Sequence, residues 1–321
     1  MPMIEKIPFK TKIKETKNGD IYINWMAGDW LANFIDYHFP KRKENLIFIS
    51  VDGIKTDLSA MKGKKIFFSG ENLEPVIKHK NIKNDYLNFR YYWFNFRKNI
   101  YKDYLINDVD VSIGYGKKNS ENYLRFPLWL MYLFSYSSSY DDIKAKISEI
   151  NNINNKGLKE CVCINRHDLF GVRTKICDDI KDTIKITYAG KWRNNTNELW
   201  SHYNDDKCKY MNLFKFNICP ENMDAQNYCT EKLFDALRCG CIPIYAGCLN
   251  KPEPGIVNND FIIMWDLDGD NYENIKLIKR LQSNENFYRK FMQQDKLTPE
   301  TVDYVVDRFN VLRQKLSKIL S

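Results

Sequence analysis

The sequence predicts an α/β protein with two doubly wound domains that face each other across a cleft, and three observations carry this prediction. Short apolar runs recur along the chain with helical or loop stretches between them, and runs of this kind are typical of strands buried in parallel sheets. The runs form two series, separated by a polar stretch. The chain has 321 residues, which is enough for about two domains of ordinary size.

The two series of apolar runs define the expected strands. In the first series, we expect strands at residues 21–25, 46–51, 65–69 and 109–113. In the second series, we expect strands at residues 161–165, 184–189, 214–219, 242–245 and 261–265. Ligands of open parallel sheets bind beyond the carboxyl ends of the strands, so the cleft between the two domains is the expected site.

The polar stretch sets the expected domain limits. Residues 143–159 are rich in Asn and Lys and form the predicted linker, with a helix at its start as the alternative. We therefore expect a first, acceptor-binding domain at residues 1–150. A second domain, which binds the donor, is expected at 151–300, and a C-terminal amphipathic helix at 301–321.

Composition and charge narrow the classes of function. The net charge of +8 favours anionic ligands without identifying one. The aromatic residues lie mostly within apolar runs and form no RNA-binding signature, so we expect no nucleic-acid partner. No run reaches the roughly 18–20 apolar residues that span a bilayer, and the N-terminus lacks the apolar core of a signal peptide. We therefore expect a cytoplasmic protein.

The cysteines indicate a reducing environment. The chain has nine cysteines, all at or after Cys161, and an odd number without compact spacing favours reduced thiols. Two C-x-C pairs, Cys161/Cys163 and Cys239/Cys241, lie in apolar runs and are expected to be buried. Neither pair has the C-x-x-C or histidine spacing that a zinc site needs.

The end of the chain has the pattern of an amphipathic helix with a basic face. Its apolar positions include Val305, Phe309, Leu312 and Leu316, and basic residues lie between them. Two interpretations remain open: the helix packs on the body of the protein, or residues 302–320 make a peripheral membrane contact. In the second case the cytoplasmic protein would be membrane-associated.

One segment carries the most chemical information. Residues 214–245 predict a strand, a polar loop, a helix capped near Thr230, a glycine stop at Gly240 and a second strand. A helix N-terminus at the mouth of a sheet attracts phosphate through its free N–H groups and its dipole, and Lys232 adds a positive charge. Glu231 can accept hydrogen bonds from ribose hydroxyls. The spacing indicates either a nucleotide-diphosphate site or an ordinary capped crossover helix.

This segment resembles the donor-binding signature of the α1,3/1,4-fucosyltransferases, glycosyltransferase family 10, and most closely its bacterial members that make Lewis-type antigens. The likeness rests on Cys219-Pro220-Glu221-Asn222, Tyr228-Cys229-Thr230-Glu231-Lys232 and Gly240-Cys241-Ile242-Pro243-Ile244-Tyr245. Three other stretches match in the same order: Gly70-Glu71-Asn72, Asp110–Gly114 with Tyr123-Leu124-Arg125-Phe126-Pro127, and Cys163-Ile164-Asn165 with Arg173. Four stretches in order are a specific signal.

The resemblance implies a fold and a reaction. The fold is GT-B, in which two Rossmann-like domains face each other across a cleft. The reaction is inverting transfer of L-fucose from GDP-β-L-fucose to O3 or O4 of N-acetylglucosamine or glucose in a β-galactoside-containing glycan acceptor. No cofactor is obligatory and no metal site is implied, so Mn²⁺ or Mg²⁺ is expected at most to stimulate. Transfer from another nucleotide sugar, or to another acceptor, stays open because the first 60 residues match poorly.

The resemblance also implies roles for single residues. Glu71 would be the base that takes the proton of the acceptor hydroxyl, and Asn72 would orient it. Arg173 and Lys232 would bind the diphosphate. Glu231 would bind the ribose.

The remaining residues of the motifs have weaker implied roles. Tyr228 would lie near the phosphates and the fucose, and Asn222 would contact the donor. Glu221 shares that loop, with burial and backbone hydrogen bonds as the alternative. Asn165 would support a turn beside the site. Arg125 either supports the site or fixes the interdomain region.

Overall fold

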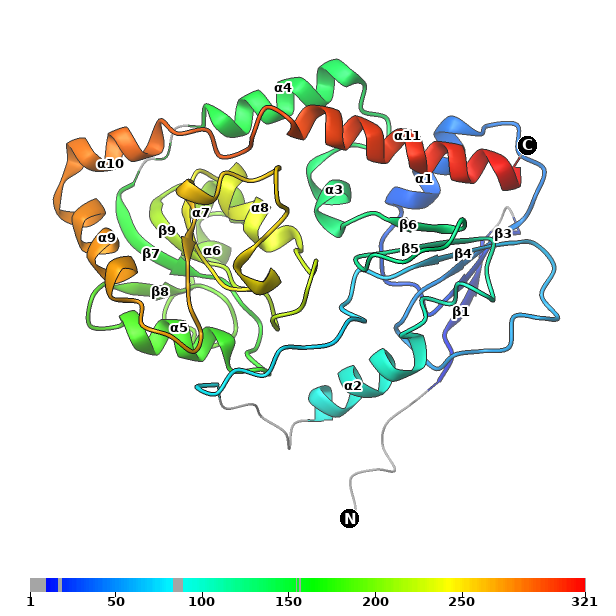
Figure 1. Cartoon of the computed structure of the whole chain (residues 1–321), viewed down its shortest axis with the longest axis horizontal. Helices are drawn as coiled ribbons and strands as arrows, with labels where there is room; N and C mark the ends of the chain where they lie inside the picture. Colours follow the sequence, from blue (N-terminus) through cyan, green and yellow to red (C-terminus); the bar gives the residue numbers. More distant parts are fainter. Residues whose placement is uncertain (1–9, 17–18, 83–88, 154, 156, 321) are drawn as a thin grey trace, which may run out of the picture.

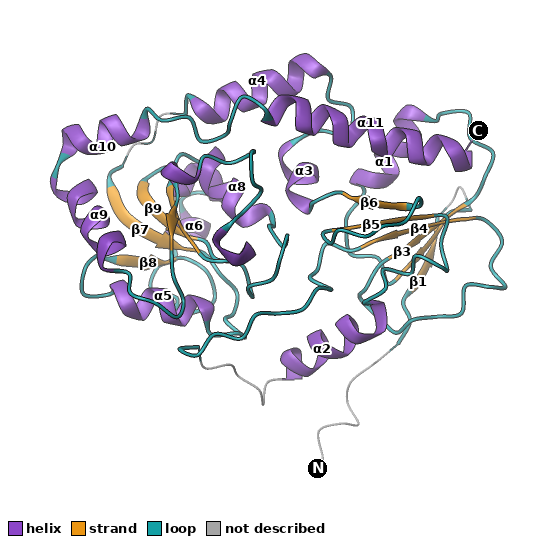
Figure 2. Cartoon of the chain, in the orientation of Figure 1, coloured by secondary structure: helices purple, strands orange, loops and turns teal. Residues whose placement is uncertain are grey.

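The computed structural model describes residues 10–16, 19–82, 89–153, 155 and 157–320. Within these residues the chain forms two sheets, one in each half of the molecule, with helices packed around both (Figures 1 and 2). The C-terminal helix runs back from the second half across the first (Figure 1).

The first sheet has the strand order β1-β2-β3-β4-β5-β6. Strand β1 pairs antiparallel with β2, and the other pairs are parallel. The strands are β1 (Ile13–Glu15), β2 (Ile21–Ile23), β3 (Leu46–Ile49), β4 (Lys64–Phe68), β5 (Val111–Gly114) and β6 (Tyr123–Arg125). The helices of this half are α1 (Trp30–His38), α2 (Phe89–Tyr101), α3 (Leu128–Leu133) and α4 (Tyr140–Asn151).

Side-chain alternation places helices on both faces of the first sheet. On β4, Ile66 and Phe68 point into the core that contains α1, whereas Phe67 points to the opposite face. There Phe67 stacks on Tyr101 of α2, with ring centroids 5.8 Å apart. Because successive residues of a strand alternate between faces, the continuous apolar run of β4 fills two layers at once.

The second sheet is parallel throughout and has the order β11-β10-β9-β7-β8. Its strands are β7 (Lys159–Cys163), β8 (Ile186–Tyr188), β9 (Phe214–Ile218), β10 (Ile242–Tyr245) and β11 (Ile263–Met264). Its helices are α5 (Val172–Ile180), α6 (Glu198–Ser201), α7 (Lys207–Met211), α8 (Glu231–Arg238), α9 (Tyr272–Ser283) and α10 (Glu285–Met292). Two short 3₁₀ turns, η2 (Cys248–Asn250) and η3 (Asn259–Phe261), lie between β10 and β11.

The strands expected from the sequence are confirmed, each within a few residues of its predicted limits. Two strands were not predicted. Strand β1 is short and exposed along its whole length, and β6 is equally short, so neither produces an apolar run. Gly240 takes a left-handed conformation (φ 80°) directly after the α8 C-cap, as predicted.

The linker predicted at 143–159 is wrong up to Asn151, because α4 occupies that part, and the alternative of a helix at its start is confirmed. Ser139 and Asp142 form a capping box at the start of this helix. Ile143, Ile147 and Ile150 recur at helical spacing and are buried. This spacing outweighs the Asn-rich composition, so we propose a domain boundary between α4 and β7.

The expectation of nine reduced thiols is wrong for one pair. Cys208 on α7 and Cys239 at the end of α8 form a disulfide, with Cα atoms 5.0 Å apart. The packing of α7 against α8 brings the two cysteines together, which their sequence separation of 31 residues does not reveal. The other seven cysteines, including Cys161, Cys163 and Cys241, are free and buried.

The C-terminal helix α11 (Thr301–Leu320) forms as predicted and buries its apolar face in the protein. Phe309 packs among the rings of Trp30, Phe34 and Phe126 of the first half. This supports the first interpretation of the helix, packing on the body of the protein. None of the described helices is both long enough and apolar enough to cross a bilayer.

The two halves are also joined by a buried ion pair. Arg125 at the end of β6 forms two bonds with Glu253, of 2.6 and 3.2 Å, and donates to Tyr304 of α11 at 2.9 Å. The structure thus places Arg125 at the interdomain contact. Although burial opposes the charge, Glu253 raises the pKa of Arg125 above its ordinary value, so the guanidinium stays charged.

We predict that Arg125→Met lowers the free energy of unfolding by about 3–5 kcal/mol, because it leaves the buried Glu253 carboxylate without a counter-charge. Chemical denaturation measures the change. The matched control is Arg289→Met, since that side chain is 73% exposed and its loss should cost less than about 0.5 kcal/mol. Equal losses for the two variants would contradict the prediction.

Candidate active site in the interdomain pocket

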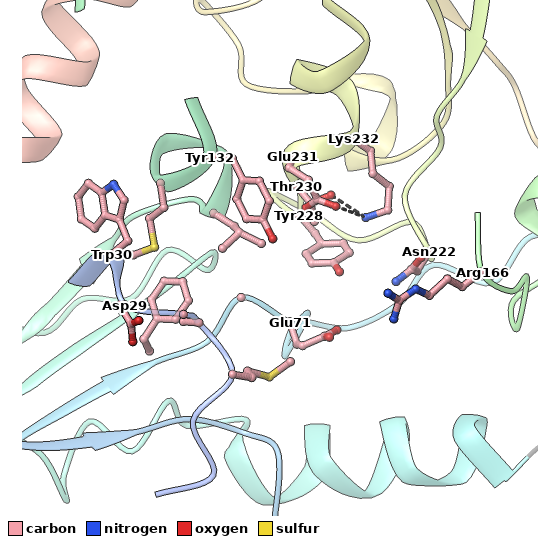
Figure 3. A pocket seen from close by; sticks show the side chains of 17 residues that line it. Asp29, Trp30, Glu71, Tyr132, Arg166, Asn222, Tyr228, Thr230, Glu231 and Lys232 are labelled. Carbon is pink, nitrogen blue, oxygen red and sulfur yellow. Dashed lines mark hydrogen bonds and ion pairs between the residues drawn. The ribbon is translucent and has the colours of Figure 1, made fainter. Parts of the chain in front are cut away.

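A pocket of about 780 Å³ lies between the two halves, and both contribute to its wall. From the first half come the loop after β2, the turn after β4, and α3. From the second half come the loops after β7 and β9 and the start of α8 (Figure 3). The β2, β4, β7 and β9 contributions all follow the carboxyl end of a parallel strand, where ligands of such sheets bind. A pocket thus lies where the sequence predicts the site.

Glu71 supplies a carboxylate from the first half. It follows β4 and Gly70, lines the pocket, and is 25% exposed. The hydroxyl of Ser69 donates to the Glu71 carbonyl at 2.9 Å and accepts from the Glu71 N–H at 3.2 Å. An ion pair of 3.2 Å joins Oε2 of Glu71 to Nη2 of Arg97 on α2. The strand end, the turn and the ion pair together hold the carboxylate at the pocket wall.

Asn72 fixes the turn that follows Glu71. Its side chain is fully buried; it accepts from the Glu74 N–H at 2.8 Å and donates to the Glu74 carbonyl at 3.1 Å. The next segment crosses to the second half, where Ile77 N–H donates to Asp224. His79 then lies between Asp224 and Asp268, 3.1 and 3.0 Å from their carboxylates. The segment that carries Glu71 is therefore tied to both halves.

On the opposite wall, Glu221 organises the start of α8. Its carboxylate is fully buried and accepts from Thr230 N–H and Thr230 Oγ1, both at 2.7 Å, and from Tyr245 at 3.2 Å. Thr230 is the N-cap residue, as predicted, but its side chain makes no cap bond. Glu221 instead accepts from the N–H of Thr230 itself, which is one of the unpaired donors at the start of a helix. The structure thus gives Glu221 the alternative role of buried hydrogen-bond partner.

Lys232 brings a positive charge into this cluster. Its Nζ lies 2.9 Å from Thr230 Oγ1, 3.3 Å from Glu231 and 3.4 Å from Glu221 (dashed lines in Figure 3 mark the bonds between residues drawn). Burial opposes the ammonium, yet the two carboxylates raise the pKa of Lys232 above its ordinary value. Burial raises the pKa of Glu221, whereas Lys232 lowers the pKa of Glu231 against the effect of burial. Lys232 and Glu231 both line the pocket as charged groups.

Two other predicted site residues line the same pocket. Tyr228 and Asn222 line the pocket. Burial, followed by the charge of Glu71, raises the pKa of Tyr228 far above its ordinary value, so its phenol stays neutral.

Arg173 is buried behind the wall of the pocket. Its Nη2 donates to Asn222 at 2.6 Å, and its Nη1 donates to the His167 carbonyl at 2.7 Å. Asn165 holds a turn, with its amide 3.1 Å from Cys163 Sγ.

Several residues of the pocket were not predicted. Arg166 follows β7 and lies beside Asn222 at one end, while Asp29 and Trp30 lie at the other end (Figure 3). Tyr132 of α3 also lines the pocket. Arg166 follows a predicted strand, so its position was a usable signal. No sequence signal pointed to Asp29 or Tyr132, because the loop before α1 and the α3 segment contain no recognisable motif.

The described residues contain no group of three or more His, Cys, Asp or Glu side chains arranged to hold a metal ion. The positive groups at the pocket are instead side chains, Arg166 and Lys232, together with the start of α8. A helix N-terminus and fixed cations favour a phosphorylated ligand. Carboxylates at the same pocket, from Glu71 and Glu231, suit hydroxyl groups. The arrangement fits a ligand that carries both phosphate and sugar.

Comparison with known proteins identifies the second half. Residues 153–311 match the model described as glycosyltransferase family 10 (fucosyltransferase) C-term. The second half of this chain belongs to glycosyltransferase family 10. The two motifs of that half, Cys163-Ile164-Asn165 with Arg173 and the 214–245 segment, lie inside the match. The two motifs of the first half lie outside it.

Two curated relatives agree with this family 10 assignment. An α-(1,3)-fucosyltransferase FucT of Helicobacter pylori is 25% identical over 300 residues. The match covers 89% of this chain and 58% of that protein, so the chain spans a little over half the relative's length. A putative fucosyltransferase-like protein of Arabidopsis thaliana is 31% identical over 84 residues, covering 26% of this chain and 15% of that protein.

Solved structures confirm the fold predicted for this chain. A crystal structure of an α1,3-fucosyltransferase matches with a TM-score of 0.57 and 16% identity, covering 91% of this chain and 89% of that one. A crystal structure of an α1,3-fucosyltransferase with GDP-fucose matches with a TM-score of 0.53 and 19% identity. This match covers 86% of this chain and 79% of that one. The α/β architecture of two sheets is therefore of the GT-B type, as the sequence predicts.

We predict that Lys232→Met destabilises the protein by about 3 kcal/mol near pH 8 and by less near pH 4. The lowered pKa of Glu231 means that its contribution is present above its ordinary pKa and lost as pH falls. The raised pKa of Lys232 means that its contribution is lost only at high pH. The loss should therefore be greatest between these limits. Urea denaturation at both pH values measures it.

The matched control for Lys232→Met is Lys276→Met, because Lys276 forms an exposed ion pair on α9. This control should change stability by less than about 0.5 kcal/mol at either pH. A loss for Lys232→Met that is the same at pH 4 and pH 8 would show that its charge is not what stabilises the cluster.

Proposed function

We propose that this protein transfers L-fucose from GDP-β-L-fucose to a glycan hydroxyl, with inversion at the anomeric carbon. The observation that carries the proposal is the opposition across one pocket of Glu71 from the first half and the cationic start of α8 from the second. The family 10 match of the donor half supports a fucosyl donor. So do the Helicobacter pylori relative, named for α-(1,3)-fucosyl transfer, and the related structure with GDP-fucose.

In this proposal the diphosphate lies at the end of the pocket that Arg166 and Lys232 line. Negative charge builds up on the leaving GDP as its bond to the sugar breaks, and fixed cations stabilise it. Arg173 supports this end because it holds Asn222 in place from behind. Its Nε is buried and has no partner within the described residues, so a donor oxygen that displaces Asn222 would find a planar pair of N–H groups. Glu231 is assigned to the ribose hydroxyls.

Glu71 is assigned as the general base. The acceptor oxygen attacks the anomeric carbon and loses its proton to Glu71, while the bond between that carbon and the β-phosphate oxygen breaks on the opposite face. Base and leaving group must therefore lie on opposite sides of the sugar. The two walls of the pocket meet this requirement, because Glu71 and Lys232 come from different halves of the molecule (Figure 3). No metal is assigned a step, and Mn²⁺ or Mg²⁺ is assigned at most a stimulating effect.

The acceptor is assigned to the end of the pocket formed by Asp29, Trp30 and Tyr132. Asp29 is exposed, and its carboxylate can accept hydrogen bonds from sugar hydroxyls. The indole of Trp30 is fixed by a 2.8 Å bond to the Phe134 carbonyl, and Tyr132 is 57% exposed. A neutral, hydroxyl-rich ring fits such a wall. We propose O3 or O4 of N-acetylglucosamine or glucose in a β-galactoside-containing glycan as the acceptor atom.

We predict that Glu71→Gln lowers the rate of fucosyl transfer by about 10²–10⁴-fold and leaves the affinity for GDP unchanged. Transfer from GDP-fucose to an array of glycan acceptors measures the rate. Calorimetry with GDP, UDP and dTDP measures the nucleotide affinity. Unchanged turnover in the variant would exclude Glu71 as the base. Selective binding of UDP would indicate another nucleotide sugar and overturn the donor assignment.

We predict that Asp29→Asn raises the KM for the acceptor about tenfold, as expected for losing a hydrogen bond to a charged group, and leaves the affinity for GDP unchanged. Initial rates at varied acceptor concentration measure KM. Asp57→Asn is the matched control, because Asp57 is exposed on the first half and does not line the pocket. An unchanged acceptor KM would show that the acceptor binds elsewhere.

A further inference from the structure

Arg97 lies directly behind Glu71, on a helix that no sequence motif identified. It belongs to α2 and is only 7% exposed. Its Nη2 lies 3.2 Å from Oε2 of Glu71. It does not line the pocket, so a ligand in the pocket would meet Glu71 and not the guanidinium. Helix α2 runs beneath the turn that carries Glu71 (Figure 3).

A buried guanidinium requires a counter-charge. Arg97 packs against the ring of Phe94 at 5.6 Å, and its Nε is buried without a hydrogen-bond partner in the described part of the chain. Glu71 is its ion-pair partner. Removing one member of a buried pair leaves an uncompensated charge. The ion pair therefore stabilises the Glu71 carboxylate in its observed position next to Arg97.

The pair leaves Glu71 able to react. A carboxylate has about four acceptor positions on its two oxygens, so it can hold the guanidinium and still accept the proton of a hydroxyl. The remaining motion of the side chain is restricted, because the bond to Arg97 adds to the turn that Ser69 holds. An error of about 1 Å in the position of a reacting group can cost about 10²-fold in rate.

We propose that Arg97 is a positioning residue for the base, and this rests on the proposed function of Glu71. The guanidinium holds the carboxylate at the pocket wall in the orientation that faces the acceptor hydroxyl. Arg97 acts through Glu71 and makes no contact with donor or acceptor. It should therefore influence the chemical step and not substrate binding.

The experiment measures fucosyl transfer for wild type, Arg97→Gln and Arg97→Lys. We expect Arg97→Gln to lower kcat about 10–100-fold and to leave the KM for GDP-fucose and the affinity for GDP within about twofold. Arg97→Lys keeps the charge and should recover part of the loss. Lys102→Gln is the matched control, because it removes an exposed positive charge just after α2 and should behave as wild type.

A double-mutant cycle separates positioning from a general loss of structure. In the Glu71→Gln background, adding Arg97→Gln should cause no further loss of transfer in single-turnover assays. Thermal unfolding gives a second reading that needs no activity. Glu71→Gln should lower Tm because it leaves Arg97 unpaired, and the double variant should recover most of that loss.

The outcomes are distinct. If wild type does not transfer fucose from GDP-fucose, the proposed function fails and this inference fails with it. If wild type transfers fucose and Arg97→Gln has the same kcat, or the two substitutions act additively on rate and Tm, the inference alone fails. If Arg97→Gln does not fold, Arg97→Lys and the double variant decide by the same criteria. A raised KM with unchanged kcat would mean that Arg97 contacts substrate, which also overturns the inference.

Discussion

The buried carboxylate of Glu221 is the interaction on which the second-half wall of the pocket depends. It bonds the backbone and the hydroxyl of Thr230, and together with Glu231 it raises the pKa of Lys232 against the effect of burial. The start of α8 would otherwise expose its N–H groups to whichever anion approached. With Glu221 in place, the N–H and the hydroxyl of the N-cap residue Thr230 are bonded in the unliganded protein, and Lys232 lines the pocket. The sequence interpretation, with phosphate bound by free N–H groups, therefore needs the amendment that at least the Thr230 N–H is already occupied.

The opposite wall depends on a similar arrangement. Glu71 projects from a strand end whose turn is fixed by Ser69 and Asn72 and whose carboxylate is held from behind by Arg97. Each wall thus presents a charged side chain to the pocket and keeps an opposite charge in the protein behind it: Glu71 in front of Arg97, and Lys232 in front of Glu221. Such pre-ordered charges need little rearrangement when a bond breaks.

The fold was largely predictable from sequence because its strands are buried on both faces. A run such as Ile66-Phe67-Phe68 encodes burial directly, whatever the tertiary contacts. Helix α4 was only the alternative to a linker, because composition was given more weight than the spacing of its isoleucines. The disulfide was missed for a different reason: the contact between α7 and α8 exists only in three dimensions. Strands β1 and β6 were missed because they are too short to form a pattern.

The site was predictable where one local unit contains it. Lys232 and Glu231 belong to a single strand–loop–helix segment, so their proximity follows from local geometry. Arg97, Asp29 and Tyr132 come from segments far apart in the chain and reach the pocket region only through the packing of the first half. Arg173 was expected at the pocket, and the structure places it one side chain deeper, behind Asn222.

The path of α11 has a consequence for how this molecule can be divided. The helix belongs by sequence to the end of the second half, yet Phe309 completes an aromatic cluster of the first. A chimera that joins the first half of one homologue to the second half of another, cut near residue 152, would pair a foreign helix with the resident aromatic cluster. The unit to transplant is therefore the stretch from β7 to the start of α11, with α11 retained from the recipient.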